Sequence, residues 1–393
     1  MTPNTNEERN RGPAGTAGSL LQPFARHLPI LAGIAIVSIV GASLSPFFLT
    51  EANLRNIVIT GSVVSVLAVG QFIVIVTAGI DLSVGAVAAL ATVVSAVLMS
   101  HDVSPLIAIA VTLAVCGLAG AINGFLVIHA GITPFIATLG MLGIAQGFAY
   151  LIQNGTFIVI DNRWFIGFFS GETGGLPNQV IIFVVIMAVF GAIMRWTAFG
   201  RQLYAIGGNA EAARLSGLPV KKNVVAAYSI SGLLAGIAGL MLAAQLGEGS
   251  SLLGQGLELD AIAAAVVGGA SLFGGLGTPV SAVIGGLLIG TISNIMNLRG
   301  IAAEPQLIIK GALILLAVYL TSGRGGDVRR RLQGLLGSVQ PGRPPQNGSG
   351  PGSGAPLSAR EQVATSADAS DRDDSERVAS GSEKSERAGS PPA

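Results

Sequence analysis

The sequence predicts an all-α membrane protein, built as a polytopic bundle of about ten transmembrane helices. Hydrophobic residues make up 51% of the 393 positions and charged residues only 11%, against roughly a quarter charged in an ordinary soluble domain. Much of the charge lies beyond Arg324, so the preceding sequence is more apolar than the average suggests. Within it, apolar runs recur at close to the 20 or so residues that cross a hydrocarbon core of about 30 Å.

Each predicted span is an apolar run of this kind, bounded by polar or glycine-rich stretches. In chain order the runs extend from Leu28 to Leu49, Ile57 to Ala78, Leu82 to Met99, Pro105 to His129, Pro134 to Leu151, Val180 to Met194, Val224 to Leu246, Leu259 to Phe273, Val280 to Leu298, and Pro305 to Leu320. The first run is too long for the apolar core of a signal peptide, so it is predicted to remain as a span. The shorter runs also fit re-entrant segments.

Composition divides the chain into three regions. Residues 1–27 form a polar N-terminal segment, residues 28–322 the transmembrane domain, and residues 323–393 a tail rich in Gly, Pro, Ser and charge. The tail has too few apolar residues to offset the entropy of ordering, so it is predicted to be disordered. Because Lys and Arg of short loops concentrate in the cytoplasm, both termini are predicted to be cytoplasmic. The loop cations on the same side are Arg195, Arg201, Arg214, Lys221 and Lys222.

The sequence also contains a candidate inverted repeat. Asp81 and Asp260 each open an apolar run, and Pro134 and Pro305 each begin a later one. An odd number of spans separates the equivalent positions, which gives the two copies opposite orientations, as in many transporters. The matched residues are mostly small, so chance similarity is the competing interpretation.

Several classes of function lack the residues that they need. A net charge of +1 provides no basic face for nucleic acid. The sequence holds no cluster typical of metal ligands and no catalytic motif, so neither a metal site nor an enzyme is predicted. It also has no Walker A motif, and no cofactor is expected in this chain. If transport uses ATP, a separate polypeptide must hydrolyse it.

The loop from Thr197 to Lys222 holds the most informative local pattern. Asn209 is a favourable N-cap, residues Ala210 to Leu215 are mostly strong helix formers, and Gly217 followed by Pro219 ends the helix. The sequence therefore predicts a short exposed helix between two spans. Taken alone, the pattern fits an ordinary interfacial helix equally well.

The stretch Ala-Ile-Gly-Gly-Asn-Ala-Glu-Ala-Ala-Arg-Leu-Ser-Gly at residues 205–217 resembles the coupling helix of ATP-binding cassette importer permeases. It is most similar to the version found in importers of ribose, xylose and related monosaccharides. Residues 78–85, 259–275 and 309–318 resemble the same family, so the similarity extends from about Leu28 to Leu320. The tail after Gly323 departs from the family's usual short end.

This resemblance implies a permease that moves a pentose or hexose into the cytoplasm across the inner membrane by alternating access. It implies a second copy of this chain, a separate cassette ATPase and an extracytoplasmic sugar-binding protein as partners. It also assigns ATPase coupling to residues Gly207, Gly208, Asn209, Glu211, Ala212, Ala213, Arg214 and Gly217. The alternatives are the same machine carrying nucleosides or branched-chain amino acids, and an ion-coupled secondary transporter that works alone.

Polar residues at membrane depth are candidates for the translocation pathway, because amides and hydroxyls recognise a neutral sugar. They are Gln71, Asp81, Ser83, Asn123, Thr133, Gln146 and Asn294. The alternative for each is a hydrogen bond between helices, and for Asp81 also a helix N-cap at a break. Asp260 and Lys310 are predicted to form a structural ion pair, and a snorkelling Lys310 is the competing interpretation.

Overall fold

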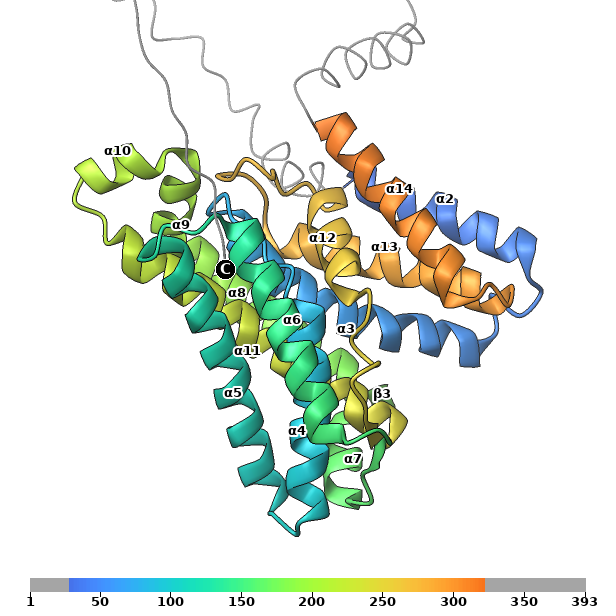
Figure 1. Ribbon diagram of the computed structural model, residues 1–393. Helices are drawn as coiled ribbons and strands as arrows, with labels where there is room; N and C mark the ends of the chain where they lie inside the picture. Colours follow the sequence, from blue (N-terminus) through green and yellow to red (C-terminus); the bar gives the residue numbers. More distant parts are fainter. Residues whose placement is uncertain (1–27, 322–393) are drawn as a thin grey trace, which may run out of the picture. The chain divides into compact units, whose positions relative to one another are not determined.

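The computed structural model describes residues 28–321 (Figure 1), and every predicted span coincides with an α-helix. The helices are α2 (Leu28–Leu44), α3 (Glu51–Ile75), α4 (Val84–Ser100), α5 (Pro105–Ile128), α6 (Pro134–Gln153), α7 (Arg163–Ser170), α8 (Asn178–Trp196), α9 (Ala198–Gly208), α10 (Ala210–Leu215), α11 (Val220–Leu246), α12 (Leu257–Val267), α13 (Pro279–Leu298) and α14 (Ala303–Thr321). The predicted N-terminal segment and tail, residues 1–27 and 323–393, lie outside the described residues.

Six of these helices are long and apolar enough to cross a membrane: α3, α5, α6, α8, α11 and α13. The helices α2 and α4 are also apolar but have only 17 residues each. The span predicted from Leu259 to Phe273 is wrong in length, because α12 has 11 residues, or about 16 Å at 1.5 Å per residue. Gly268 and Gly269 follow its last turn, and Gly269 has a φ of +95°. An all-α polytopic membrane protein is thus confirmed, whereas a count of about ten crossings stays a prediction.

Local sequence explains where many of the helices begin. A proline occupies the first turn of α5, α6 and α13, where its missing N–H costs no hydrogen bond. Thr50 caps α3 by accepting a hydrogen bond from the Asn53 N–H, and Thr278 caps α13 through the Ser281 N–H.

Two very short antiparallel ribbons connect the helices. Strand β1 (Ile158–Val159) pairs with β4 (Glu248–Gly249), and β2 (Glu172–Thr173) pairs with β3 (Leu176–Pro177). Helix α7 lies between β1 and β2 and was not predicted. Asn162 starts it by accepting a hydrogen bond from the Phe165 N–H at 3.0 Å.

We call helices α3 to α6 the first helix set and helices α11 to α14 the second helix set. The two sets make corresponding contacts. Helix α3 packs against α12 and α13, and α11 packs against α4 and α5. Helix α4 contacts α5 and α6, just as α12 contacts α13 and α14. Figure 1 shows α13 and α14 at the right of the view, beside α2 and α3. The two helix sets therefore contact each other in a corresponding way, whereas the inverted orientation of a repeat stays a prediction.

The two aspartates of the predicted repeat do not occupy equivalent places in these sets. Asp81 precedes the first residue of α4, whereas Asp260 lies inside the first turn of α12. The prolines agree better, because Pro134 and Pro305 both lie in the first turn of their helices.

Glycine permits the closest contacts between the sets. A Cβ atom at Gly120 of α5 would overlap the backbone carbonyl of Tyr228 in α11. A Cβ atom at Gly285 of α13 would overlap the carbonyl of Ala264 in α12. Small residues at such crossings allow the tight packing that holds membrane helices together.

The outer helices expose apolar side chains. Leu118 of α5, Leu151 of α6 and Trp196 of α8 are all largely exposed, while nearly all of α3 from Gly61 onward is buried. An exposed apolar belt of this kind is expected of a surface that contacts lipid.

Candidate functional site

Helix α10 forms as predicted, which confirms its boundaries. The Asn209 Oδ1 atom accepts a hydrogen bond from the Ala212 N–H at 2.9 Å, and Gly217 follows the helix with a φ of +79°. Ala213 is buried and packs with Ile206 and Val224. The helix is therefore fixed to the body of the protein by one face.

The other face of α10 is fully accessible. Arg214 donates two hydrogen bonds to the Glu211 carboxylate, at 3.0 Å and 2.6 Å. These bonds hold the pKa of Glu211 below its ordinary value and raise that of Arg214. Beside the pair, the Leu215 side chain is 74% exposed. This face of α10 therefore presents both charged and apolar groups.

The predicted coupling residues divide into two groups. Glu211, Ala212, Arg214 and Gly217 are exposed, as are Gly208 and Asn209. Gly207 is instead buried, and a Cβ atom there would overlap the carbonyl of Val76 after α3 and lie 2.5 Å from the Gly275 nitrogen. Gly207 thus touches the chain's own interior.

Around Gly207, three segments meet in what we call the glycine junction: the end of α9 (204–208), the turn after α3 (76–79) and the segment after α12 (274–278). The Gly275 N–H donates to the Val76 carbonyl at 2.9 Å. The Tyr204 hydroxyl donates to the Gly277 carbonyl at 2.8 Å. The glycine junction therefore joins the end of α9, which directly precedes α10, to the segments that follow α3 and α12.

Directly beyond this junction, the chain between α3 and α4 is not helical, and Asp81 and Ser83 within it are buried. Asp81 Oδ1 accepts hydrogen bonds from the Ser83 N–H at 2.9 Å and the Ser83 hydroxyl at 2.6 Å. Its Oδ2 atom accepts from the Ser231 hydroxyl of α11 at 3.0 Å. Ser83 is the N-cap of α4, so Asp81 does not occupy the capping position that was the alternative to its pathway role. Such internal bonds are what permit irregular backbone at membrane depth.

Two more predicted residues join this network. Asn123 of α5 donates to the Ser83 hydroxyl at 2.9 Å, and Asn123 Oδ1 has no partner among the described residues. In the amide orientation that satisfies both of its groups, Gln71 donates to the Asp81 carbonyl at 2.9 Å and accepts from the Asp81 N–H at 3.2 Å. Gln71, Asp81, Ser83 and Asn123 thus form one buried cluster that braces the break.

The remaining pathway candidates lie elsewhere. Gln146 donates to the Ser251 carbonyl at 2.8 Å, which joins α6 to the segment before α12. Thr133 is exposed and its hydroxyl does not cap α6. Asn294 and Asn53 exchange hydrogen bonds of 2.9 Å and 3.1 Å between α13 and α3.

Asp260 and Lys310 lie together, with the Lys310 Nζ atom 2.7 Å from Asp260 Oδ2. Both side chains are mostly buried, which agrees with a structural pair and not with a lysine extended toward the interface. The pair joins α12 to α14.

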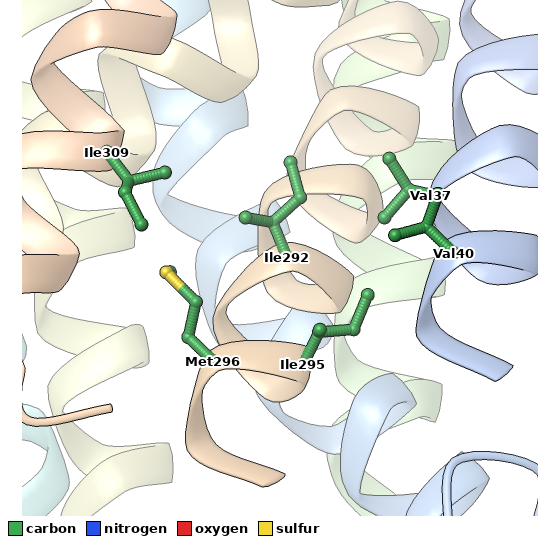
Figure 2. A pocket seen from close by; sticks show the side chains of 6 residues that line it. All are labelled: Val37, Val40, Ile292, Ile295, Met296 and Ile309. Carbon is green, nitrogen blue, oxygen red and sulfur yellow. The ribbon is translucent and has the colours of Figure 1, made fainter. Parts of the chain in front are cut away.

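Two cavities differ in chemistry. Figure 2 shows the first, of about 210 Å³ between α2, α13 and α14, lined by Val37, Val40, Ile292, Ile295, Met296 and Ile309. The second, which we call the amide pocket, has about 390 Å³ and is lined by Asn53, Asn56, Thr60, Gln245, Asn294 and Asn297, with Leu298 as its one aliphatic member. Only the second cavity offers hydrogen bonds to a polar ligand.

Most residues that line the amide pocket were not predicted from the sequence. Asn53, Asn56, Gln245 and Asn297 were passed over because they lie at helix ends, where polar residues are ordinary. The recurrence of amides at the ends of three separate spans was the available signal.

Comparison with known proteins identifies membrane permeases as relatives, which agrees with the apolar helices of the structure. The profile of the family described as "Branched-chain amino acid transport system / permease component" matches residues 53–318. The D-allose transport system permease protein AlsC of Escherichia coli K12 is 40% identical over 289 residues, 73% of this chain and 89% of that protein. The ribose import permease protein RbsC of the same strain is 40% identical over 75% of this chain and 91% of its own length.

More distant relatives cover the same region. The L-arabinose ABC transporter permease protein AraH of Azospirillum brasilense is 34% identical over 81% of this chain and 93% of its own. Among solved structures no match is found. A match across most of the chain and nearly all of each relative shows common descent, and the chain therefore belongs to the family of multi-pass inner-membrane permease components of ATP-binding cassette importers.

Proposed function

We propose that this chain is the permease subunit of a monosaccharide importer, which moves a pentose or hexose into the cytoplasm. The observation that carries the proposal is the 40% identity to permeases named for ribose and D-allose, over about nine tenths of their length. The exposed face of α10 supports the same assignment, because an importer without its own ATPase needs such a docking surface.

The orientation that fits this function places α10 in the cytoplasm, together with both termini. Five cations lie in or close to α10 in the sequence, which agrees with the positive-inside rule. They are Arg195, Arg201, Arg214, Lys221 and Lys222. The ends of α3, α11 and α13 that hold the amide pocket then face outward.

The transport mechanism that we propose is alternating access, with about ten membrane segments organised as an inverted repeat. The corresponding contacts of the two helix sets support a repeat. In this scheme α10 and its neighbours Gly207, Gly208 and Asn209 receive force from a separate cassette ATPase, which is where ATP is bound and hydrolysed. The glycine junction passes the displacement to α3 and α12.

The other proposed partners are an extracytoplasmic sugar-binding protein and a second copy of this chain. The binding protein delivers the ligand to the outward ends of the helices. A homodimer would place one α10 against each of two ATPase sites.

The proposal is tested with the complete importer in proteoliposomes. The permease, its ATPase and its binding protein are reconstituted, and uptake of labelled D-ribose, D-allose, L-arabinose, L-leucine and uridine is measured with and without ATP. We expect ATP-dependent uptake of at least one of the sugars, and none of leucine or uridine.

A control with the permease alone addresses the secondary-transporter alternative. Vesicles that contain only this chain should show no uptake driven by a proton or sodium gradient. Accumulation by the chain alone, or import of leucine or uridine in place of any sugar, would overturn the proposed function.

A further inference from the structure

The amide pocket lies at the ends of α3, α11 and α13 that are remote from α10. Helix α11 starts beside α10, and Gln245 lies in its last turn. The other end of α3 contacts Gly207, whereas Asn53 and Asn56 lie in its first turns. The pocket is therefore separated from the coupling surface by the length of the longest helices.

The floor of the pocket is fixed. Asn53 and Asn294 are 5% and 8% exposed and hold each other by reciprocal hydrogen bonds of 2.9 Å and 3.1 Å. Asn53 also donates to the Phe48 carbonyl at 2.9 Å. Amides held in this way present the same groups to every ligand, which lowers the entropy lost on binding.

The rim has hydrogen-bonding groups to spare. Asn56, Gln245 and Asn297 are exposed, and the Asn56 amide has no partner among the described residues. Gln245 accepts from Gln179 at 3.4 Å and Asn297 accepts from Gln306 at 2.8 Å, so the NH₂ group of each points to no acceptor in the described chain. An amide carries both donors and acceptors, as a hydroxyl does.

No charged side chain lines the pocket, although two arginines are close in sequence. Arg55 forms an ion pair with Glu172, and Arg299 donates to the Leu44 carbonyl at 3.1 Å. Each guanidinium group is therefore held by a partner outside the amide pocket. A zwitterionic amino acid would find no opposite charge there for its carboxylate and ammonium groups, whereas neutral hydroxyls need only the amide donors and acceptors.

We infer that the amide pocket is the entry site of this permease, where a neutral polyhydroxylated ligand is received on the side opposite α10. The inference rests on the proposed sugar-import function and names the site and chemistry of recognition. A volume of about 390 Å³ lies within the range of roughly 300–1,000 Å³ typical of small-ligand pockets. The pocket selects against charged solutes as well as for hydroxyls.

The test replaces rim amides with leucine in the complete reconstituted importer. We expect the double variant Asn56→Leu and Gln245→Leu to lower uptake of labelled D-ribose, D-allose or L-arabinose about tenfold, because two hydrogen bonds of about 0.5–1.5 kcal/mol each are lost. ATP hydrolysis by the complete importer, measured without sugar, should stay at the wild-type rate. The matched control is Gln255→Leu, an exposed amide between α11 and α12 outside the pocket.

Uptake by the double variant equal to that of the control would overturn the inference while leaving the proposed function intact. Failure of the wild-type importer to take up any of the sugars would instead overturn the proposed function itself.

A second measurement tests the inference even if the double leucine variant assembles poorly. Cys116 is the single cysteine of the chain and is buried, so Asn56→Cys introduces one accessible thiol. Its labelling by a membrane-impermeant maleimide in the complete importer should slow severalfold when a transported sugar is present during turnover. Labelling unaffected by the sugar would contradict an entry site at Asn56.

Discussion

In the first helix set, the break before α4 is held by hydrogen bonds that the Asp81 carboxyl group accepts from Ser83 and Ser231. In the second helix set, the start of α12 is held by the ion pair of Asp260 and Lys310. The two sets make corresponding helix contacts, yet they are braced by different chemistry.

The difference follows from what each break touches. The break of the first set borders the glycine junction, where α9 meets the turn after α3. Three hydrogen bonds to the Asp81 carboxyl group hold the chain there. The ion pair of the second set instead joins α12 to α14 through one contact between Asp260 and Lys310.

The largest expected effect comes from breaking the ion pair. Lys310→Met leaves the Asp260 carboxylate buried without its partner, so we expect a loss of about 3–5 kcal/mol in stability. Thermal unfolding of the detergent-solubilised permease measures this loss. The control is the double variant Asp260→Leu and Lys310→Met, which removes both charges and should recover most of it. Equal destabilisation of the single and double variants would show that the pair does not act as a brace.

The second prediction concerns the glycine junction of the first set. Gly207→Ala places a methyl group against the Val76 carbonyl and the Gly275 nitrogen, so we expect a loss of about 1–3 kcal/mol from overpacking, with severely reduced transport. Gly143→Ala in α6 is the matched control, because a Cβ atom there has no neighbour within 4 Å. The readouts are thermal unfolding and sugar uptake. Similar behaviour of the two alanine variants would contradict a tight junction.

The smallest effect on stability is expected outside both sets, on α10. Glu211→Ala removes an exposed pair, so the unfolding temperature should not change measurably. Sugar uptake per ATP hydrolysed should nevertheless fall, because we place Glu211 at the ATPase contact. Glu304→Ala, an exposed carboxylate of α14, is the control and should leave both quantities unchanged. Normal coupling in Glu211→Ala would remove α10 from the proposed mechanism.

The same residue gives an expectation for pH. The bonds from Arg214 keep the pKa of Glu211 below its ordinary value, so the ion pair persists above that lowered pKa and is lost only as pH falls through it. Coupling through Glu211 should therefore stay constant from pH 7 down to about 5, above the ordinary glutamate pKa of roughly 4.3.

The sequence predicted the helices well, because spans and caps depend on local pattern. Each predicted span coincides with a helix, and α10 has the expected boundaries. Helix α12 was predicted too long because hydropathy continues through Gly268 and Gly269, where the backbone turns. Helices α7 and α9 were missed because both are short and amphipathic.

Contacts between distant residues were less predictable. The pairing of Asp260 with Lys310 was anticipated because charges buried in a membrane need partners. Ser231 as a partner of Asp81, and the gathering of Asn56, Gln245 and Asn297 in one pocket, depend on how α3, α11 and α13 pack. No local pattern encodes that packing.

The reciprocal bonds between Asn53 and Asn294 have an evolutionary consequence. The two residues are 241 positions apart in the chain, yet each satisfies the other inside the protein. Replacement of one leaves a buried donor and acceptor unmatched on the other. A substitution at one position alone is therefore unfavourable, so related sequences should retain both asparagines or replace both together.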